Sequence, residues 1–135
     1  MTPVLAVLVD CDGVAATTEG LALKSVTLTL KKHVESANLD EIAQAGLGMN
    51  PGGFWENVAR TQKTNKSAAE LTEIEWTEFM RLLRWQIKHH PHTVIFRETQ
   101  ALISDLVARG YRLGLVSSAF QEEIDLLRTS FPVLS

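Results

Sequence analysis

Two aspartates follow an apolar segment close to the start of the chain. Residues 4–9 are all apolar, and Asp10, Cys11, Asp12 and Gly13 come directly after them. Two carboxylates one residue apart repel each other, and a cation or a shared proton offsets that repulsion. Gly13 would let the backbone turn tightly and approach a ligand. These residues predict a cation-binding or proton-sharing site, although a strand followed by a simple Asp-Gly turn explains them equally well.

The apolar segment predicts the element that carries these carboxylates. A continuous apolar run of this length is typical of a strand that is buried on both faces, which requires helices on both sides of the sheet. Such a layered arrangement is an α/β fold. Because parallel strands bind ligands at their carboxyl ends, we expect Asp10 and Asp12 to lie at the ligand-binding edge.

A second strand with polar residues at its end is predicted near the C-terminus. Residues 111–116 form another mainly apolar segment, and Ser117 and Ser118 follow it. A helix is predicted over residues 119–129, with Phe120, Ile124 and Leu127 on its apolar face. The free N–H groups and partial positive charge of a helix N-terminus favour an anion, so this strand end predicts an anion site.

The middle of the chain is predicted to be helical. Two capping boxes support helix starts, Asn38 with Glu41 and Ser67 with Glu70. Apolar spacing predicts helices over residues 19–35, 39–45, 54–61, 68–89 and 98–109, the last ended by Gly110. Residues 26–30 also alternate as in a strand, so a strand is the alternative there. All three tryptophans lie in this section, at positions 55, 76 and 85, so we expect a helical subdomain with its own aromatic core.

Three other features admit a chemical role, and a structural role is favoured for each. Residues 46–53 contain four glycines and could close over a phosphate, but a plain loop between helices is the simpler interpretation. No histidine or asparagine lies near Cys11 in the sequence to activate its thiol, so a small core residue is favoured. The histidines at positions 89, 90 and 92 fit a helix C-terminus better than a metal site.

The motif around Asp10 resembles that of a known family. The run from Asp10 to Val14, followed by Thr18 and Glu19, is similar to the first motif of the haloacid dehalogenase-like (HAD) phosphatases and phosphomutases, in the branch of β-phosphoglucomutase and the CbbY-like phosphatases. The strand that ends at Ser117 resembles their second motif. The family usually has an aspartate where this chain has Thr17, and a Pro-Gly near the position of Arg97 and Glu98.

The resemblance implies a mechanism and a set of site residues. Asp10 would be the nucleophile that forms an aspartyl-phosphate, and Asp12 would be the general acid and base. Mg²⁺ would bind at Asp10 and at the backbone carbonyl of Asp12, and a small phosphorylated metabolite would be the substrate. The phosphate would be held by Ser117, Ser118 and Gly13, and the cap residues near the substrate would be Thr18, Glu19, Gly48 and Asn50.

The same resemblance implies an incomplete fold. It predicts a Rossmann-like HAD core in residues 1–16 and 94–135, with an inserted α-helical cap in residues 17–93. The family also uses a lysine after the second strand and a later acidic pair, but no lysine follows Lys88 here. We therefore expect the N-terminal part of a phosphatase or phosphomutase, weakly active or inactive as given. A non-catalytic relic that binds a partner and a small structural module are the alternatives.

The composition is that of an ordinary soluble protein. The chain has 135 residues, of which 45% are apolar and 21% charged, and its net charge is −3. No basic face suggests nucleic acid, and the longest apolar run is too short to cross a membrane. A single cysteine agrees with a reducing compartment. We expect a cytoplasmic protein that binds neither nucleic acid nor membrane, and that self-associates through an exposed edge of its thin sheet.

Overall fold

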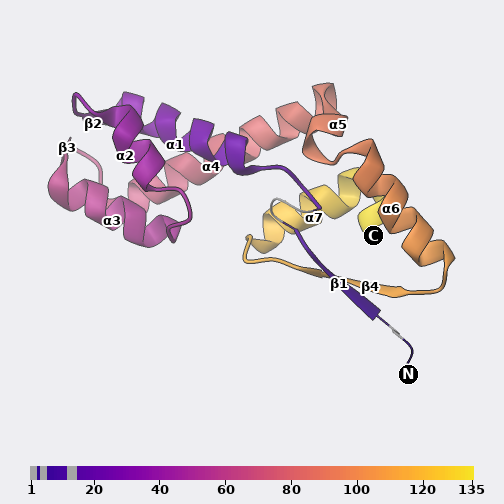
Figure 1. Ribbon diagram of the computed structural model, residues 1–135. Helices are drawn as coiled ribbons and strands as arrows, with labels where there is room; N and C mark the ends of the chain where they lie inside the picture. The colour runs from indigo at the N-terminus through magenta and orange to yellow at the C-terminus, as the bar shows by residue number, and fades with distance from the viewer. Residues whose placement is uncertain (1–2, 4–5, 12–14) are drawn as a thin grey trace. The chain divides into compact units, whose positions relative to one another are not determined.

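The computed structural model describes residues 3, 6–11 and 15–135. The chain divides into two compact units, one made of residues 1–19 and 85–135 and the other of residues 20–84. The first contains a parallel sheet with helices, and the second is mostly helical (Figure 1). Within the described part of the chain, no helix is long and apolar enough to cross a membrane.

The sheet of the first unit consists of two parallel strands. Strand β1 (Ala6–Asp10) pairs with β4 (Arg112–Val116), so the two predicted strands are confirmed and lie side by side. The register places Ala6 opposite Arg112 and Asp10 opposite Val116. Parallel strands need a long connection between them, and the intervening residues include the whole helical unit.

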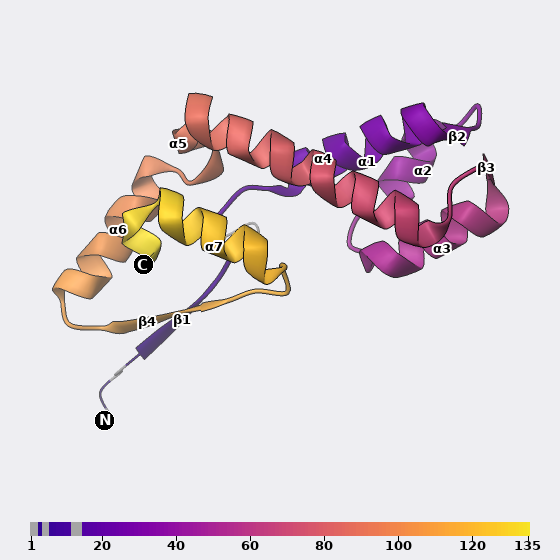
Figure 2. The same cartoon turned by 180° about the vertical axis from the view of Figure 1, so that it is seen from behind.

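The expectation that the first strand is buried on both faces is wrong. Val7 and Val9 are half-buried, but Ala6, Leu8 and Asp10 are exposed, and Leu8 retains 75% of its accessible surface. The reason is that helices α6 (Arg97–Ala108) and α7 (Gln121–Ser130) lie on the same face of the sheet in both views (Figures 1 and 2). Alternating side chains therefore point to one covered face and one open face.

Helix ends in this unit follow partly from the sequence. Gly110 ends α6 as predicted, because its φ of +85° is the left-handed conformation that glycine adopts without strain. The predicted start of α7 is wrong: the helix begins at Gln121, and Phe120 is its N-cap residue with 57% of its surface exposed. The core anchors of this helix are Leu127, which is fully buried, and the half-buried Ile124.

The second unit is built from helices around one apolar cluster. Its elements are α1 (Glu19–His33), β2 (Val34–Glu35), α2 (Leu39–Ala45), α3 (Pro51–Thr61), β3 (Lys63–Thr64) and most of α4 (Ala68–His89). The buried cluster consists of Leu30, Val34, Ala43, Phe54, Trp55, Val58 and Leu71. A short element, α5 (Pro91–Val94), follows α4 in the first unit. The helices predicted from apolar spacing in this unit are therefore present, but the first ends at His33, and Val34 and Glu35 form a strand instead of the predicted last half-turn.

One of the two capping boxes forms. Ser67 Oγ accepts from the N–H of Glu70 at 3.1 Å, and Glu70 Oε2 accepts from the N–H of Ser67 at 2.8 Å. The Asn38 box is wrong, because the Asn38 side chain makes no capping hydrogen bond and its backbone lies outside the extended region that a cap needs.

The glycine-rich segment is only partly a loop. Helix α3 begins at Pro51, three residues earlier than predicted, so Gly52 and Gly53 form its first turn. The Asn50 carboxamide oxygen accepts from the N–H groups of Gly52 at 3.0 Å and Gly53 at 3.4 Å. A proline at the first helical position needs no N–H partner, which favours this start.

The prediction that the three tryptophans share one aromatic core is wrong in part. Trp55 is fully buried in the apolar cluster, and Trp76 stacks on Phe79 with ring centroids 5.5 Å apart. Trp85 instead belongs to the first unit, is 50% exposed and packs against His89 and His90 at 4.8 Å and 5.4 Å. The histidines thus lie at a helix end, as the sequence indicated.

Candidate functional site

The candidate site begins at the carboxyl end of the parallel sheet. Asp10 is the last residue of β1 and lies opposite Val116, the last residue of β4. The pairing continues one step further, because the N–H of Cys11 donates to the carbonyl of Val116 at 3.0 Å. Ser117 follows Val116 directly, so the register brings Asp10 and Ser117 to the same edge of the sheet.

The Asp10 side chain belongs to the open face of the sheet. Asp10 is exposed. The neighbouring Cys11 is fully buried, which agrees with a core role for the thiol. The backbone carbonyls of Asp10 and Cys11 accept from the N–H groups of Ala15 at 3.1 Å and Ala16 at 2.7 Å. Asp12 and Gly13, predicted as acid–base and phosphate-binding residues, lie outside the described residues.

The second polar segment follows β4. Ser117 is half-buried, and its Oγ accepts from the N–H of Ala119 at 2.9 Å. Ser118 is exposed. Helix α7 starts three residues after Ser118, at Gln121, without a side-chain cap, and Glu122 and Glu123 lie in its first turn. The predicted helix N-terminus is therefore present, with two acidic residues that oppose anion binding at that end.

Thr17 has a structural role that the sequence did not indicate. Its N–H donates to the carbonyl of Val94 at 2.8 Å, and its Oγ1 lies 2.5 Å from the carbonyl of Thr93. These contacts tie the segment after β1 to the segment before α6, across more than seventy positions of sequence. No local pattern in the sequence could have revealed a partner so distant.

The four predicted cap residues occupy different local environments. Thr18 is buried at 5% exposure, and Glu19 is the exposed first residue of α1. Gly48 has a φ of +77°, and the Asn50 side chain caps α3. Contact of these residues with a substrate stays a prediction.

Metal ligands are limited among the residues that the structure describes. In those residues, no group of three or more histidine, cysteine, aspartate or glutamate side chains could hold an ion. The exposed Asp10 carboxylate provides a hard oxygen ligand of the type that Mg²⁺ prefers. The chemistry of the Asp10 side chain therefore fits magnesium, and Asp12 lies outside the described part of the chain.

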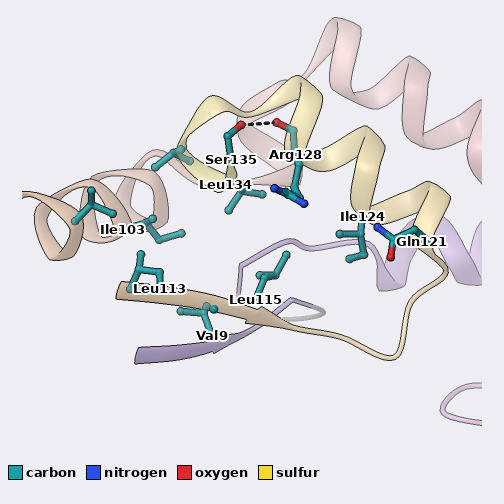
Figure 3. Close-up of a pocket in the computed structure, with 12 residues that line it drawn as sticks. Val9, Ile103, Leu113, Leu115, Gln121, Ile124, Arg128, Leu134 and Ser135 are labelled. Atoms are coloured by element: carbon teal, nitrogen blue, oxygen red, sulfur yellow. Dashed lines mark hydrogen bonds between the residues drawn. The ribbon is translucent and has the colours of Figure 1, made fainter. Parts of the chain in front are cut away.

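A cavity lies on the other face of the sheet. Its volume is about 450 Å³, and Figure 3 shows Val9, Leu113 and Leu115 pointing into it from the strands, with Ile124 and Arg128 above them on α7. Neither Asp10 nor Ser117 lines it. The cavity lies between the sheet and its helices, its lining includes the polar residues Gln121, Arg128 and Ser135, and it is separate from the carboxyl edge.

The comparisons with known proteins identify the fold. No protein-family model and no curated protein matches the chain. A solved structure of a candidate phosphatase from Clostridium difficile matches 98% of the chain at 17% identity with a TM-score of 0.71. A variant of CbbY from Rhodobacter sphaeroides, in complex with xylulose-(1,5)-bisphosphate, matches 95% at 16% identity with a TM-score of 0.68.

The chain corresponds to 58% and 57% of the lengths of these two structures. At such identities the similarity describes the fold alone. The chain has a mixed α/β fold with parallel strands, of the type found in HAD-like phosphatases.

Proposed function

We propose that this chain contains the nucleophile and part of the phosphate site of a Mg²⁺-dependent phosphatase or phosphomutase that acts on a small phosphorylated metabolite. The observation that carries the proposal is the parallel register, which pairs Asp10 with Val116 and so brings Asp10 and Ser117 to one edge. The fold is that of HAD-like phosphatases, and the neighbouring CbbY structure contains a phosphorylated sugar. A carboxylate and a hydroxyl at that edge suit phosphoryl transfer.

In this proposal, Asp10 and Asp12 divide the chemistry. A carboxylate oxygen of Asp10 attacks the phosphorus, the bond from phosphorus to the ester oxygen breaks, and Asp12 gives its proton to the leaving alcohol. Asp12 then takes a proton from water, which attacks the phosphorus and breaks its bond to Asp10. The phosphate leaves, and Asp10 returns to its starting state. The exposure of Asp10 on the open face supports access by a substrate.

Ser117 holds the transferred phosphoryl group in this scheme. Its Oγ accepts a hydrogen bond from the N–H of Ala119. A serine hydroxyl also carries one proton, which Ser117 would donate to a phosphate oxygen in this scheme. Ser118, which is exposed beside it, and Gly13 complete the proposed phosphate contacts. When bound at Asp10 and Asp12, Mg²⁺ would neutralise charge on the phosphoryl group.

The helical unit is proposed to act as a substrate-selecting cap, with residues 17–93 as the cap and residues 1–16 and 94–135 as the core. The two compact units divide the chain close to these bounds, which supports the proposal. Thr18, Glu19, Gly48 and Asn50 are the proposed cap residues near the substrate.

Turnover by this chain is proposed to be weak. No lysine follows Lys88 to neutralise the phosphate. Removal of one such charge-stabilising group commonly costs about 3 kcal/mol of transition-state stabilisation. Binding of a phosphoryl mimic is therefore a better readout than hydrolysis.

The proposal is tested by titrating the chain with beryllium fluoride and Mg²⁺, followed by ¹⁹F NMR. The wild-type chain should give a bound signal, and Asp10→Asn should lose it, because the beryllium bonds to a carboxylate oxygen. Asp40→Asn is the matched control, since Asp40 is an exposed aspartate in the first turn of α2. A bound signal that persists in Asp10→Asn would contradict the proposal.

A further inference from the structure

A buried carboxyl group joins two helices of the helical unit. Glu75 on α4 is 8% exposed, and Ser25 on α1 is fully buried. Ser25 Oγ lies 2.5 Å from Glu75 Oε1 and 2.8 Å from the backbone carbonyl oxygen of Ala22. The two helices run side by side in both views (Figures 1 and 2), so this contact connects positions fifty residues apart in the sequence.

The number of protons available in this contact determines whether the Glu75 carboxyl group is protonated or ionised. A serine hydroxyl has one proton to donate, while the carbonyl of Ala22 can only accept. If Ser25 donated to a charged Glu75, the oxygens of Ser25 and Ala22 would lie 2.8 Å apart with no proton between them. A protonated Glu75 satisfies both contacts, because it donates to Ser25 and Ser25 donates to Ala22.

No opposite charge compensates Glu75 if it is ionised. Ser25 is its one polar partner among the residues that the structure describes. On α4, Glu78 is paired with Arg81 at 2.6 Å, and Glu73 is exposed. On α1, the positive charge of Lys32 lowers the pKa of Glu78. The remaining charged residues on these helices are Glu19, Lys24, Lys31, His33, Glu70, Arg84, Lys88 and His89. The causes that act on the pKa of Glu75 are its burial and the hydrogen bond with Ser25, and none of these charges is among them.

We infer that Glu75 is a pH-dependent contact between α1 and α4, intact when the carboxyl group is protonated and weakened when it ionises. Burial raises the pKa of Glu75 above its ordinary value of 4.5. A raised folded-state pKa contributes stability that is complete below the unfolded value and is lost as the pH rises through the folded value. The helical unit should therefore lose stability as the pH rises above 4.5. This inference does not depend on the proposed function.

The first test is a pH series of urea denaturation on the full chain and on Glu75→Gln. The glutamine amide can donate to Ser25 at every pH, so the variant should lose the decline in stability that the wild type has above pH 4.5. Glu73→Gln, an exposed position on the same helix, is the control and should retain that decline. Parallel pH profiles for the wild type and Glu75→Gln would overturn the inference.

A second measurement uses the wild-type chain and does not depend on the folding of a variant. In the chain labelled with ¹³C at glutamate side chains, the Glu75 carboxyl resonance should titrate above pH 4.5. A Glu75 titration at or below pH 4.5 would overturn the inference, whatever the outcome for Glu75→Gln.

Discussion

Asp10 and Val116 are register partners at the carboxyl ends of two parallel strands. The residue after Val116 is Ser117, so two residues separated by more than one hundred positions, one with a carboxylate and one with a hydroxyl, lie at the same edge of the sheet. The hydrogen bond from the N–H of Cys11 to the Val116 carbonyl continues this register one residue beyond the end of β1. The proposed phosphoryl chemistry depends on this alignment.

Ser117→Ala should weaken beryllium fluoride binding in the presence of Mg²⁺. A hydrogen bond to a charged group contributes about 1.5–3 kcal/mol, which corresponds to roughly a tenfold or larger loss of affinity. The chain should also lose a little stability, because Ser117 Oγ no longer accepts from Ala119. Ser118→Ala is the neighbouring comparison and should weaken binding less. Equal affinity of Ser117→Ala and the wild type would remove Ser117 from the site.

The capping box at the start of α4 should affect stability in a pH-dependent way. Ser67→Ala should cost about 1 kcal/mol of unfolding free energy, because the N–H of Glu70 loses its acceptor. The hydrogen bond from the Ser67 backbone lowers the pKa of Glu70 below 4.5. Its contribution is therefore present above pH 4.5 and lost as the pH falls further. Glu70→Gln should flatten this acidic part of the stability profile, measured by urea denaturation; an unchanged acid profile would be the contrary result.

Two glycines should respond to alanine in opposite directions. Gly110→Ala should destabilise the chain by about 1–2 kcal/mol, because its φ of +85° is costly for a residue with a Cβ. Gly53→Ala should stabilise it by about 0.5–1 kcal/mol, since Gly53 is helical and a Cβ there meets no atom within 4 Å. Urea denaturation midpoints of the two variants check both signs, and a shared sign would be inconsistent with these backbone conformations.

Trp55→Phe should cost much less stability than the size change suggests. The Trp55 side chain is fully buried, and among the described residues its Nε1–H has no hydrogen-bond partner. An unsatisfied buried donor costs about 1–3 kcal/mol, and phenylalanine removes it. Trp55→Ala should cost about 3–5 kcal/mol, because it leaves a cavity in the core. Equal destabilisation by the two variants would mean that the indole N–H is satisfied.

The sequence predicted the elements better than their environments. Apolar runs located both strands of the parallel sheet, β1 and β4, but not the two-residue strands β2 and β3. Helical spacing located α4 to its last residue. The exposure of Leu8 could not be predicted, because it depends on which face of the sheet α6 and α7 cover, and these helices lie far along the chain. The start of α3 could have been predicted from Asn50 and Pro51, a cap and a first-turn proline, had the glycines not suggested a loop.

The location of the candidate site at the carboxyl edge of the sheet was predicted from residue types alone. Strands that end in polar residues indicate a site at that edge wherever they pair in parallel. The pairing partner itself could not be predicted from spacing. Likewise, the role of Thr17 depends on the carbonyls of Thr93 and Val94, which no short pattern connects with it.

The most direct test of the account is a map of backbone amide shifts in the ¹⁵N-labelled chain when beryllium fluoride and Mg²⁺ are added together. We expect the largest changes in two segments distant in sequence, around Asp10 and Cys11 and around Ser117 and Ser118, and we expect Asp10→Asn to abolish both. Changes confined to one of these segments, or centred elsewhere in the chain, would contradict a phosphoryl site at the shared edge of β1 and β4.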